Sequence, residues 1–91
     1  MASELLTDHE AFMVVCAVRY ALGRQSYAPS IVMKEVRRLR SRIPQGDILV
    51  IVDSIRTDLA YLTRLGGTVA YGDEWTALAD ELAPPPAAGG E

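Results

Sequence analysis

The chain has very few residues of the kinds that carry catalysis or hold metals. Its 91 residues include one cysteine and one histidine. Cys16 has no second cysteine for an internal disulfide, which is typical of a reducing compartment, and its apolar neighbours predict a buried side chain. His9 has no second ligand at metal-site spacing, and a metal site needs several converging ligands. We therefore expect no metal, no cofactor and no enzymatic activity.

Long apolar runs and a basic leader are also missing. The longest apolar run, residues 11–18, has eight residues, whereas a membrane-spanning helix needs about 20. The first ten residues, MASELLTDHE, are acidic, whereas a secretory leader begins with basic residues. We therefore expect a cytoplasmic protein with no membrane partner.

The apolar content is sufficient for one folded domain. Hydrophobic residues make up 49% of the chain and charged residues 23%, a composition that excludes disorder for most of the sequence. The length fits a single domain with a modest core. We expect this domain to span residues 1–83 and to be followed by a flexible tail, residues 84–91, whose Pro/Ala/Gly composition cannot continue a helix.

The net charge of −3 conceals an uneven layout. Residues 1–18 carry three acids and no Lys or Arg, and residues 19–42 carry seven basic residues against Glu35 alone. The remainder carries eight acids against two arginines. The central basic block therefore either pairs with acidic segments across the fold or faces solvent and meets an acidic partner.

A first helix is predicted from about residue 8 to residue 22. Thr7 or Asp8 can cap it, Glu10 stands at capping-box spacing from Thr7, and Gly23 is suited to end it in the left-handed conformation. The helix is apolar nearly all round. Such a helix is either enclosed by the rest of the fold or buries one side in another subunit.

A second helix, beginning near Ser26 or Ser30, is predicted to be amphipathic with a basic outer side. Its apolar positions repeat at i, i+4, i+7 and i+11 and form one seam. They are Val32, Val36, Leu39 and Ile43. Five basic residues lie off that seam: Lys34, Arg37, Arg38, Arg40 and Arg42. These five are our candidate partner-binding residues.

The third element is ambiguous over a short stretch. Residues 48–52 are rich in β-branched side chains and fit a buried strand, which would make the protein α+β. Apolar residues continue at helical spacing as far as Leu62, however, which favours a helix capped by Asp47. With a short last helix from Asp73 to Leu82, the predicted fold is all-α, a compact bundle of three main helices plus a short C-terminal helix.

The segment VRYALGRQSY places bulky polar residues beside the core. Its notable residues are Arg19, Tyr20, Gly23, Arg24 and Tyr27. We expect Arg19 to be buried and paired with Asp53 or Asp58, because a buried unpaired charge is costly. Arg24 is expected to bind the last carbonyl groups of the helix, and the two tyrosines to lie between helices. This reading is structural rather than catalytic.

The same segment carries a resemblance. CAVRYALGRQSYAPSIVMKEV resembles small accessory proteins of bacteriophages and prophages in which a segment like ALRYALGRxTY is followed by an apolar helix. Later helices of those proteins are similar to IVDSIRTDL and to WTALADEL, so the likeness covers roughly residues 11–82. Ser26 stands here where those proteins often have Thr. The resemblance implies a small protein made by a phage and working in the cytoplasm of a bacterial host.

These observations lead to two functional hypotheses. The first is a phage-derived, anti-CRISPR-like inhibitor that occludes a site on a host protein or nucleoprotein complex, through the basic helix or through an acidic surface that mimics nucleic acid. The alternative is a small DNA-binding regulator that uses the same basic helix. The acidic pI of about 5.0 counts against the second. The sequence is compatible with both a monomer and a homodimer.

Overall fold

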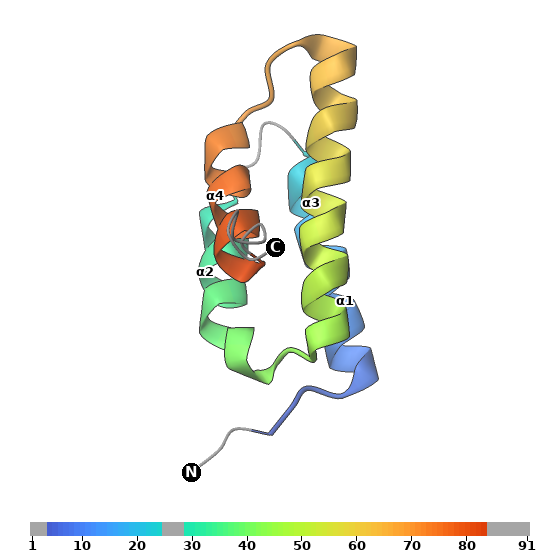
Figure 1. Cartoon of the computed structure of the whole chain (residues 1–91), viewed down its shortest axis with the longest axis vertical. Coiled ribbons are helices and arrows are strands. Elements are labelled where there is room, and N and C mark those ends of the chain that lie inside the picture. Colours follow the sequence, from blue (N-terminus) through green and yellow to red (C-terminus); the bar gives the residue numbers. More distant parts are fainter. Residues whose placement is uncertain (1–3, 25–28, 84–91) are drawn as a thin grey trace, which may run out of the picture.

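Four helices account for the fold of this computed structural model, which describes residues 4–24 and 29–83. They are α1 (Asp8–Gly23), α2 (Ser30–Leu39), α3 (Gln45–Gly66) and α4 (Gly72–Leu82), and a short 3-10 helix, η1 (Arg40–Arg42), follows α2. Figure 1 shows that α1 and α3 run in one direction and α2 and α4 in the other. The predicted all-α fold is confirmed. Residues 48–52 lie inside α3, so the strand alternative is wrong.

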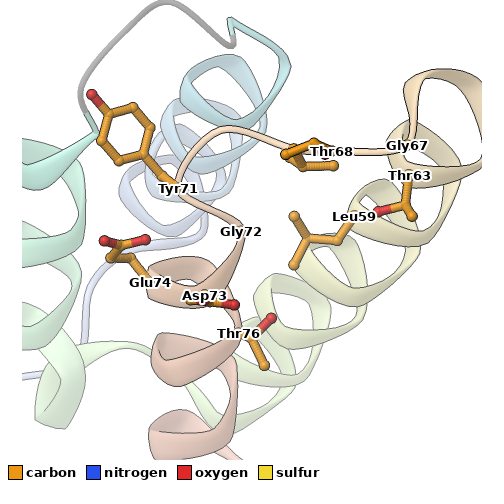
Figure 2. Close-up of a pocket in the computed structure, with 10 residues that line it drawn as sticks. Leu59, Thr63, Gly67, Thr68, Tyr71, Gly72, Asp73, Glu74 and Thr76 are labelled. Atoms are coloured by element: carbon orange, nitrogen blue, oxygen red, sulfur yellow. The ribbon is translucent and has the colours of Figure 1, made fainter.

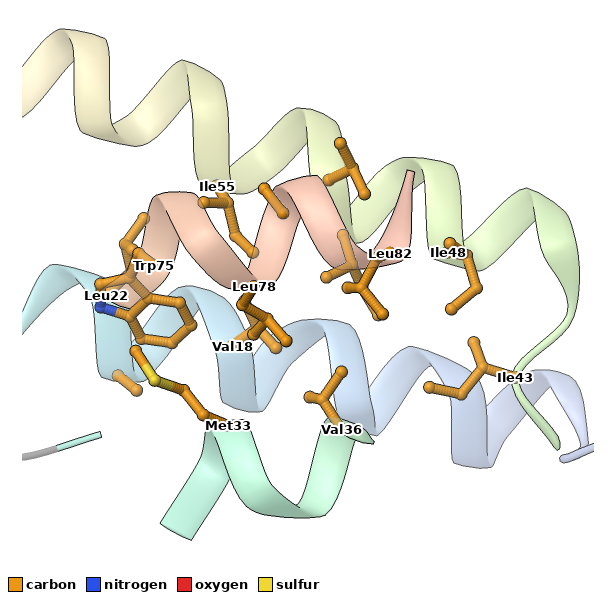
Figure 3. Packing of buried hydrophobic residues seen from close by; sticks show 14 of the residues in the cluster. Val18, Leu22, Met33, Val36, Ile43, Ile48, Ile55, Trp75, Leu78 and Leu82 are labelled. Carbon is orange, nitrogen blue, oxygen red and sulfur yellow. The ribbon is translucent and has the colours of Figure 1, made fainter. Parts of the chain in front are cut away.

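The core lies between the four helices and is entirely apolar. α3 packs against α1 and α4, and α2 packs against α1. The largest enclosed side chains come from every helix: Trp75, Ile51, Ile55, Leu78, Val18 and Val36. In Figure 3, Trp75 lies with Leu22 and Met33 at one end of this core. Each buried side chain of this size contributes about 1.5–3 kcal/mol, so α4 is held mainly by apolar contact.

The start of α1 follows the sequence prediction. The Thr7 hydroxyl accepts a hydrogen bond from the Glu10 N–H at 3.1 Å, and the Glu10 carboxylate accepts one from the Thr7 N–H at 2.9 Å. The backbone hydrogen bond from Thr7 holds the pKa of Glu10 below its usual value. The helix ends at Gly23, as predicted, although Gly23 is not left-handed. A reciprocal capping box therefore fixes the point where α1 begins.

α1 is open on one side. Ala11, Val18, Ala21 and Leu22 are buried against the other helices, whereas Cys16 on the opposite side is exposed. The prediction of a buried Cys16 is therefore wrong. The main contacts of α1 are with α3 and α2, and they leave the side of the helix that carries Cys16 open to solvent.

The remaining helix ends differ slightly from their predicted positions. α3 begins two residues before Asp47, directly after Pro44, and Asp47 lies in its first turn. The helix ends at Gly66 and is capped by Gly67, whose φ of 87° is easily adopted by glycine and whose N–H donates to the Thr63 carbonyl at 2.7 Å. α4 begins after Tyr71, a tyrosine with a left-handed φ of 61°. None of the helices within residues 4–24 and 29–83 is both long and apolar enough to cross a bilayer.

Candidate functional site

The five predicted partner-binding residues lie along the outer side of α2 and η1. We call them the basic surface: Lys34, Arg37, Arg38, Arg40 and Arg42. Val36 on the same helix is buried, whereas all five basic residues except the half-buried Arg42 are exposed. The predicted amphipathic pattern of this helix is therefore confirmed.

Arg37 connects the basic surface to α4. Its Nε donates to Glu81 Oε1 at 2.9 Å and its Nη2 donates to Glu81 Oε2 at 3.1 Å. This is the parallel two-bond geometry that makes arginine suited to carboxylates. The hydrogen bond from Arg37, with the charge of Arg40 nearby, holds the pKa of Glu81 below its usual value. Arg37 therefore has a structural partner within the fold.

Arg40 and Arg42 bind backbone carbonyl groups of distant segments. Arg40 Nη2 donates to the Leu82 carbonyl at 3.3 Å, at the end of α4. Arg42 Nε donates to the Glu4 carbonyl at 3.0 Å, while its own carbonyl accepts from the Leu6 N–H at 2.8 Å. A cation at the end of α4 also interacts favourably with the helix dipole. Both arginines thus hold chain segments against η1.

Lys34 and Arg38 are the two members of the basic surface without a partner on another element. Arg38 Nε donates to Glu35 Oε1 at 3.1 Å, a contact within α2, and Arg38 Nη2 donates to Glu35 Oε2. This pairing holds the pKa of Glu35 below its usual value. Within the described part of the chain, Lys34 has no hydrogen bond or ion pair. The basic block is thus divided between pairing across the bundle and exposure to solvent.

Arg19 is placed differently from its prediction. Its side chain is 62% exposed, and its Nε lies 3.9 Å from Asp58 Oδ2 on α3. Asp58 is one of the two predicted partners, but the prediction that Arg19 is buried is wrong. Asp53, the other predicted partner, is exposed on the far side of α3. The Arg19–Asp58 pair is a surface contact between α1 and α3, and such pairs stabilise proteins little.

Tyr20 and Arg24, the other large residues of the motif that the structure describes, also face solvent. Arg24 Nη1 donates to the Tyr20 hydroxyl at 3.1 Å, and its guanidinium lies 5.4 Å from the centre of the Tyr20 ring. Tyr20 is exposed rather than wedged between helices. The backbone N–H of Arg24, not its side chain, closes the helix by donating to the Ala21 carbonyl. Tyr27 lies outside the described residues.

The exposed side of α1 is a candidate site that the sequence prediction did not single out. We call it the apolar strip: Phe12, Met13, Cys16, Ala17 and Tyr20. The three largest members are 63%, 57% and 60% exposed, namely Phe12, Met13 and Tyr20. The sequence feature that indicates this site is the apolar character of the helix on nearly all its sides. Exposed apolar surface of this extent often marks an interaction site.

An open hollow of about 440 Å³ lies between the end of α3 and the start of α4. In Figure 2, Leu59 and Thr63 of α3 stand across it from Asp73 and Thr76 of α4. Tyr71 turns toward α2, where it lines a second hollow of about 230 Å³. Hydroxyl and carboxylate groups dominate the larger hollow. In the residues that the structure describes, no three His, Cys, Asp or Glu side chains gather to hold a metal ion.

Comparison of the chain with protein-family models, with curated protein sequences and with solved structures finds no match.

Proposed function

We propose that this chain is a binding protein that occludes a site on an acidic macromolecular partner through its basic surface. The supporting observation is the position of Lys34 and Arg38, which face solvent on the side of α2 away from the pairs with α4. Ile31, 72% exposed, lies one turn before Lys34 on the same side. An exposed apolar side chain flanked by cations is a combination suited to a protein interface.

The resemblance to phage accessory proteins supports a particular setting for this activity. A small inhibitor made by a phage gains most by blocking a host defence complex, such as a CRISPR effector. The basic surface suits an acidic patch on such a complex rather than its positively charged nucleic-acid channel. Occlusion needs a rigid surface and no chemistry. The intramolecular bonds of Arg37, Arg40 and Arg42 fix the edge of the basic surface and leave Lys34 and Arg38 able to contact a partner.

Binding of DNA by the same helix is the less supported alternative. Arg37 and Arg38 each lie against a carboxylate, which reduces the positive potential available to phosphate groups. The chain as a whole is acidic. A DNA-binding regulator would require these carboxylates to be displaced or repelled on binding.

The test is affinity capture from bacterial lysates that contain defence complexes, followed by quantitative binding to the captured partner. Lys34→Glu is the main variant. Arg64→Glu is the matched control, because Arg64 is also exposed and lies in the last turn of α3. We expect Lys34→Glu to weaken binding at least about tenfold, as for a charge reversed within an interface, and Arg64→Glu to leave it unchanged.

Equal binding by wild type and Lys34→Glu would place the contact elsewhere and overturn this proposal. Random duplex DNA is titrated in parallel at low salt. Binding tighter than about 100 μM, weakened as salt increases, would favour the DNA-binding alternative.

A further inference from the structure

The apolar strip of α1 lies on one continuous side of the helix. Phe12, Cys16 and Tyr20 follow one another at intervals of four residues, and Met13 and Ala17 run beside them. Residues at this spacing form a line along the helix surface, about 12 Å long from Phe12 to Tyr20. Cys16 stands at the middle of the line and is exposed.

The two ends of this strip carry opposite charges, acidic at the start of α1 and basic at its end. Asp8 and Glu10 lie in the first turn of α1, and Arg24 follows its last residue. Arg24 contacts Tyr20, and no carboxylate in the described part of the chain pairs with it. The strip between the two ends carries no charge. A partner surface that complements α1 must therefore be apolar in the middle, basic at one end and acidic at the other.

A second copy of α1, turned end for end, meets these requirements. Antiparallel packing with Cys16 opposite Cys16 brings Phe12 of each copy to the level of Tyr20 of the other. It also brings Glu10 of each copy within about two residues, or roughly 3 Å, of the level of Arg24 of the other. Parallel packing would place like charges together. Antiparallel packing also opposes the two helix dipoles, which is favourable.

The apolar area of the strip suits a small interface. A large side chain carries about 150–250 Å², so exposure near 60% leaves roughly 100 Å² or more on each of Phe12, Met13 and Tyr20. With Cys16 and Ala17 the strip offers on the order of 400 Å² per copy, comparable to the functional patches of monomeric proteins. Two such strips bury on the order of 800 Å² in total, less than the roughly 1,200 Å² of stable specific interfaces, so the strip suits a weak association.

We propose that two copies of the chain associate through the apolar strip, with their α1 helices packed antiparallel about a two-fold axis near Cys16. The interface is self-complementary, as a two-fold interface requires. It lies on α1 and leaves the basic surface of α2 uncovered in both copies. The dimer therefore presents two basic surfaces, and this inference stands or falls independently of the function proposed above.

The first test is the mass of the protein in solution as a function of concentration, by sedimentation from about 1 μM to about 1 mM, because small interfaces give weak complexes. We expect the wild type to pass from monomer to dimer. Phe12→Glu should remain a monomer with unchanged helix content, since Phe12 is exposed. Ile31→Glu, an equally drastic change at an exposed apolar residue of α2, is the matched control and should still dimerise.

The second test is chemical and locates the axis. A short bis-maleimide should link wild-type chains through Cys16, because association raises the local concentration of the two thiols. The control is Cys16→Ser/Thr76→Cys, whose one cysteine lies at an exposed position of α4 away from the proposed axis. The wild type should be linked at least about tenfold faster than this control. Arg24→Glu should weaken the dimer, whereas Arg64→Glu should not. A wild type that stays monomeric to about 1 mM, or a Phe12→Glu variant that still dimerises, overturns the proposal.

Discussion

α1 and α4 differ in apolar content and in how they use it: eleven of the sixteen residues of α1 are apolar, against five of the eleven of α4. In α4 the large apolar side chains all point inward: Trp75, Leu78 and Leu82 are buried, and the outer side carries Asp80 and Glu81, which pair with arginines of α3 and α2. In α1 the inner side is buried just as completely, but Phe12, Met13 and Tyr20 remain outside. The apolar content of α1 therefore exceeds what its contacts with the other helices cover, whereas the large apolar side chains of α4 are all covered.

The largest effect that separates the two helices is expected from truncating an aromatic residue in each. Trp75→Ala removes a side chain that is 1% exposed and should lower the free energy of unfolding by about 3–5 kcal/mol. Phe12→Ala, measured at a concentration where the chain is monomeric, should change it by less than about 0.5 kcal/mol. Urea titration followed by circular dichroism measures both. Similar losses for the two variants would mean that the outer side of α1 is covered within the monomer.

A medium effect is expected at the start of α1. Thr7→Ala removes the hydroxyl that accepts from the Glu10 N–H and should lower the free energy of unfolding by about 1 kcal/mol. Thr7→Ser retains the acceptor and is the matched control. If Thr7→Ala and Thr7→Ser are equally stable, the capping box does not contribute to the stability of α1.

The smallest effect concerns the polar contacts of α4. Arg37 lowers the pKa of Glu81 below its ordinary value of about 4.5, so the unfolded chain binds a proton more readily than the folded one does. The contribution to stability is therefore complete above pH 4.5 and declines as the pH falls below it. Glu81→Gln should flatten this acid decline slightly, because it removes the carboxyl group that Arg37 stabilises in its charged form. Identical acid profiles for wild type and Glu81→Gln would contradict the assignment.

The parts of the fold that depend on local pattern were predictable from the sequence. The seam of α2 was identified because charged residues mark its outer side, and α3 was assigned as a helix because the apolar spacing continues well beyond residue 52. The capping box at Thr7 and the end of α3 at Gly67 follow from side-chain and backbone chemistry within a few residues. These features need no knowledge of the other helices.

The candidate sites were less predictable because they depend on neighbours. Arg19 was expected inside since apolar residues precede it, but α3 contacts only one flank of α1 and leaves its guanidinium in solvent. For the apolar strip, the sequence left two alternatives open: α1 is enclosed by the rest of the fold, or it has one apolar side left for another subunit. The pairing of Arg37 with Glu81, 44 residues apart, depends on how α2 and α4 are placed. The distribution of charge along the sequence indicated that ion pairs could form between the basic block and the acidic segments, but it did not identify which residues pair.

Tyr71 has one further consequence for how this chain can change. A left-handed backbone costs a residue other than glycine roughly 1–2 kcal/mol, and Tyr71 adopts it with φ of 61° while lining the hollows on both sides of α4. Substitution by glycine would relieve the backbone and remove one side chain from the lining of both hollows in a single step. A single substitution, Tyr71→Gly, can therefore change the shape of both hollows and the backbone strain together.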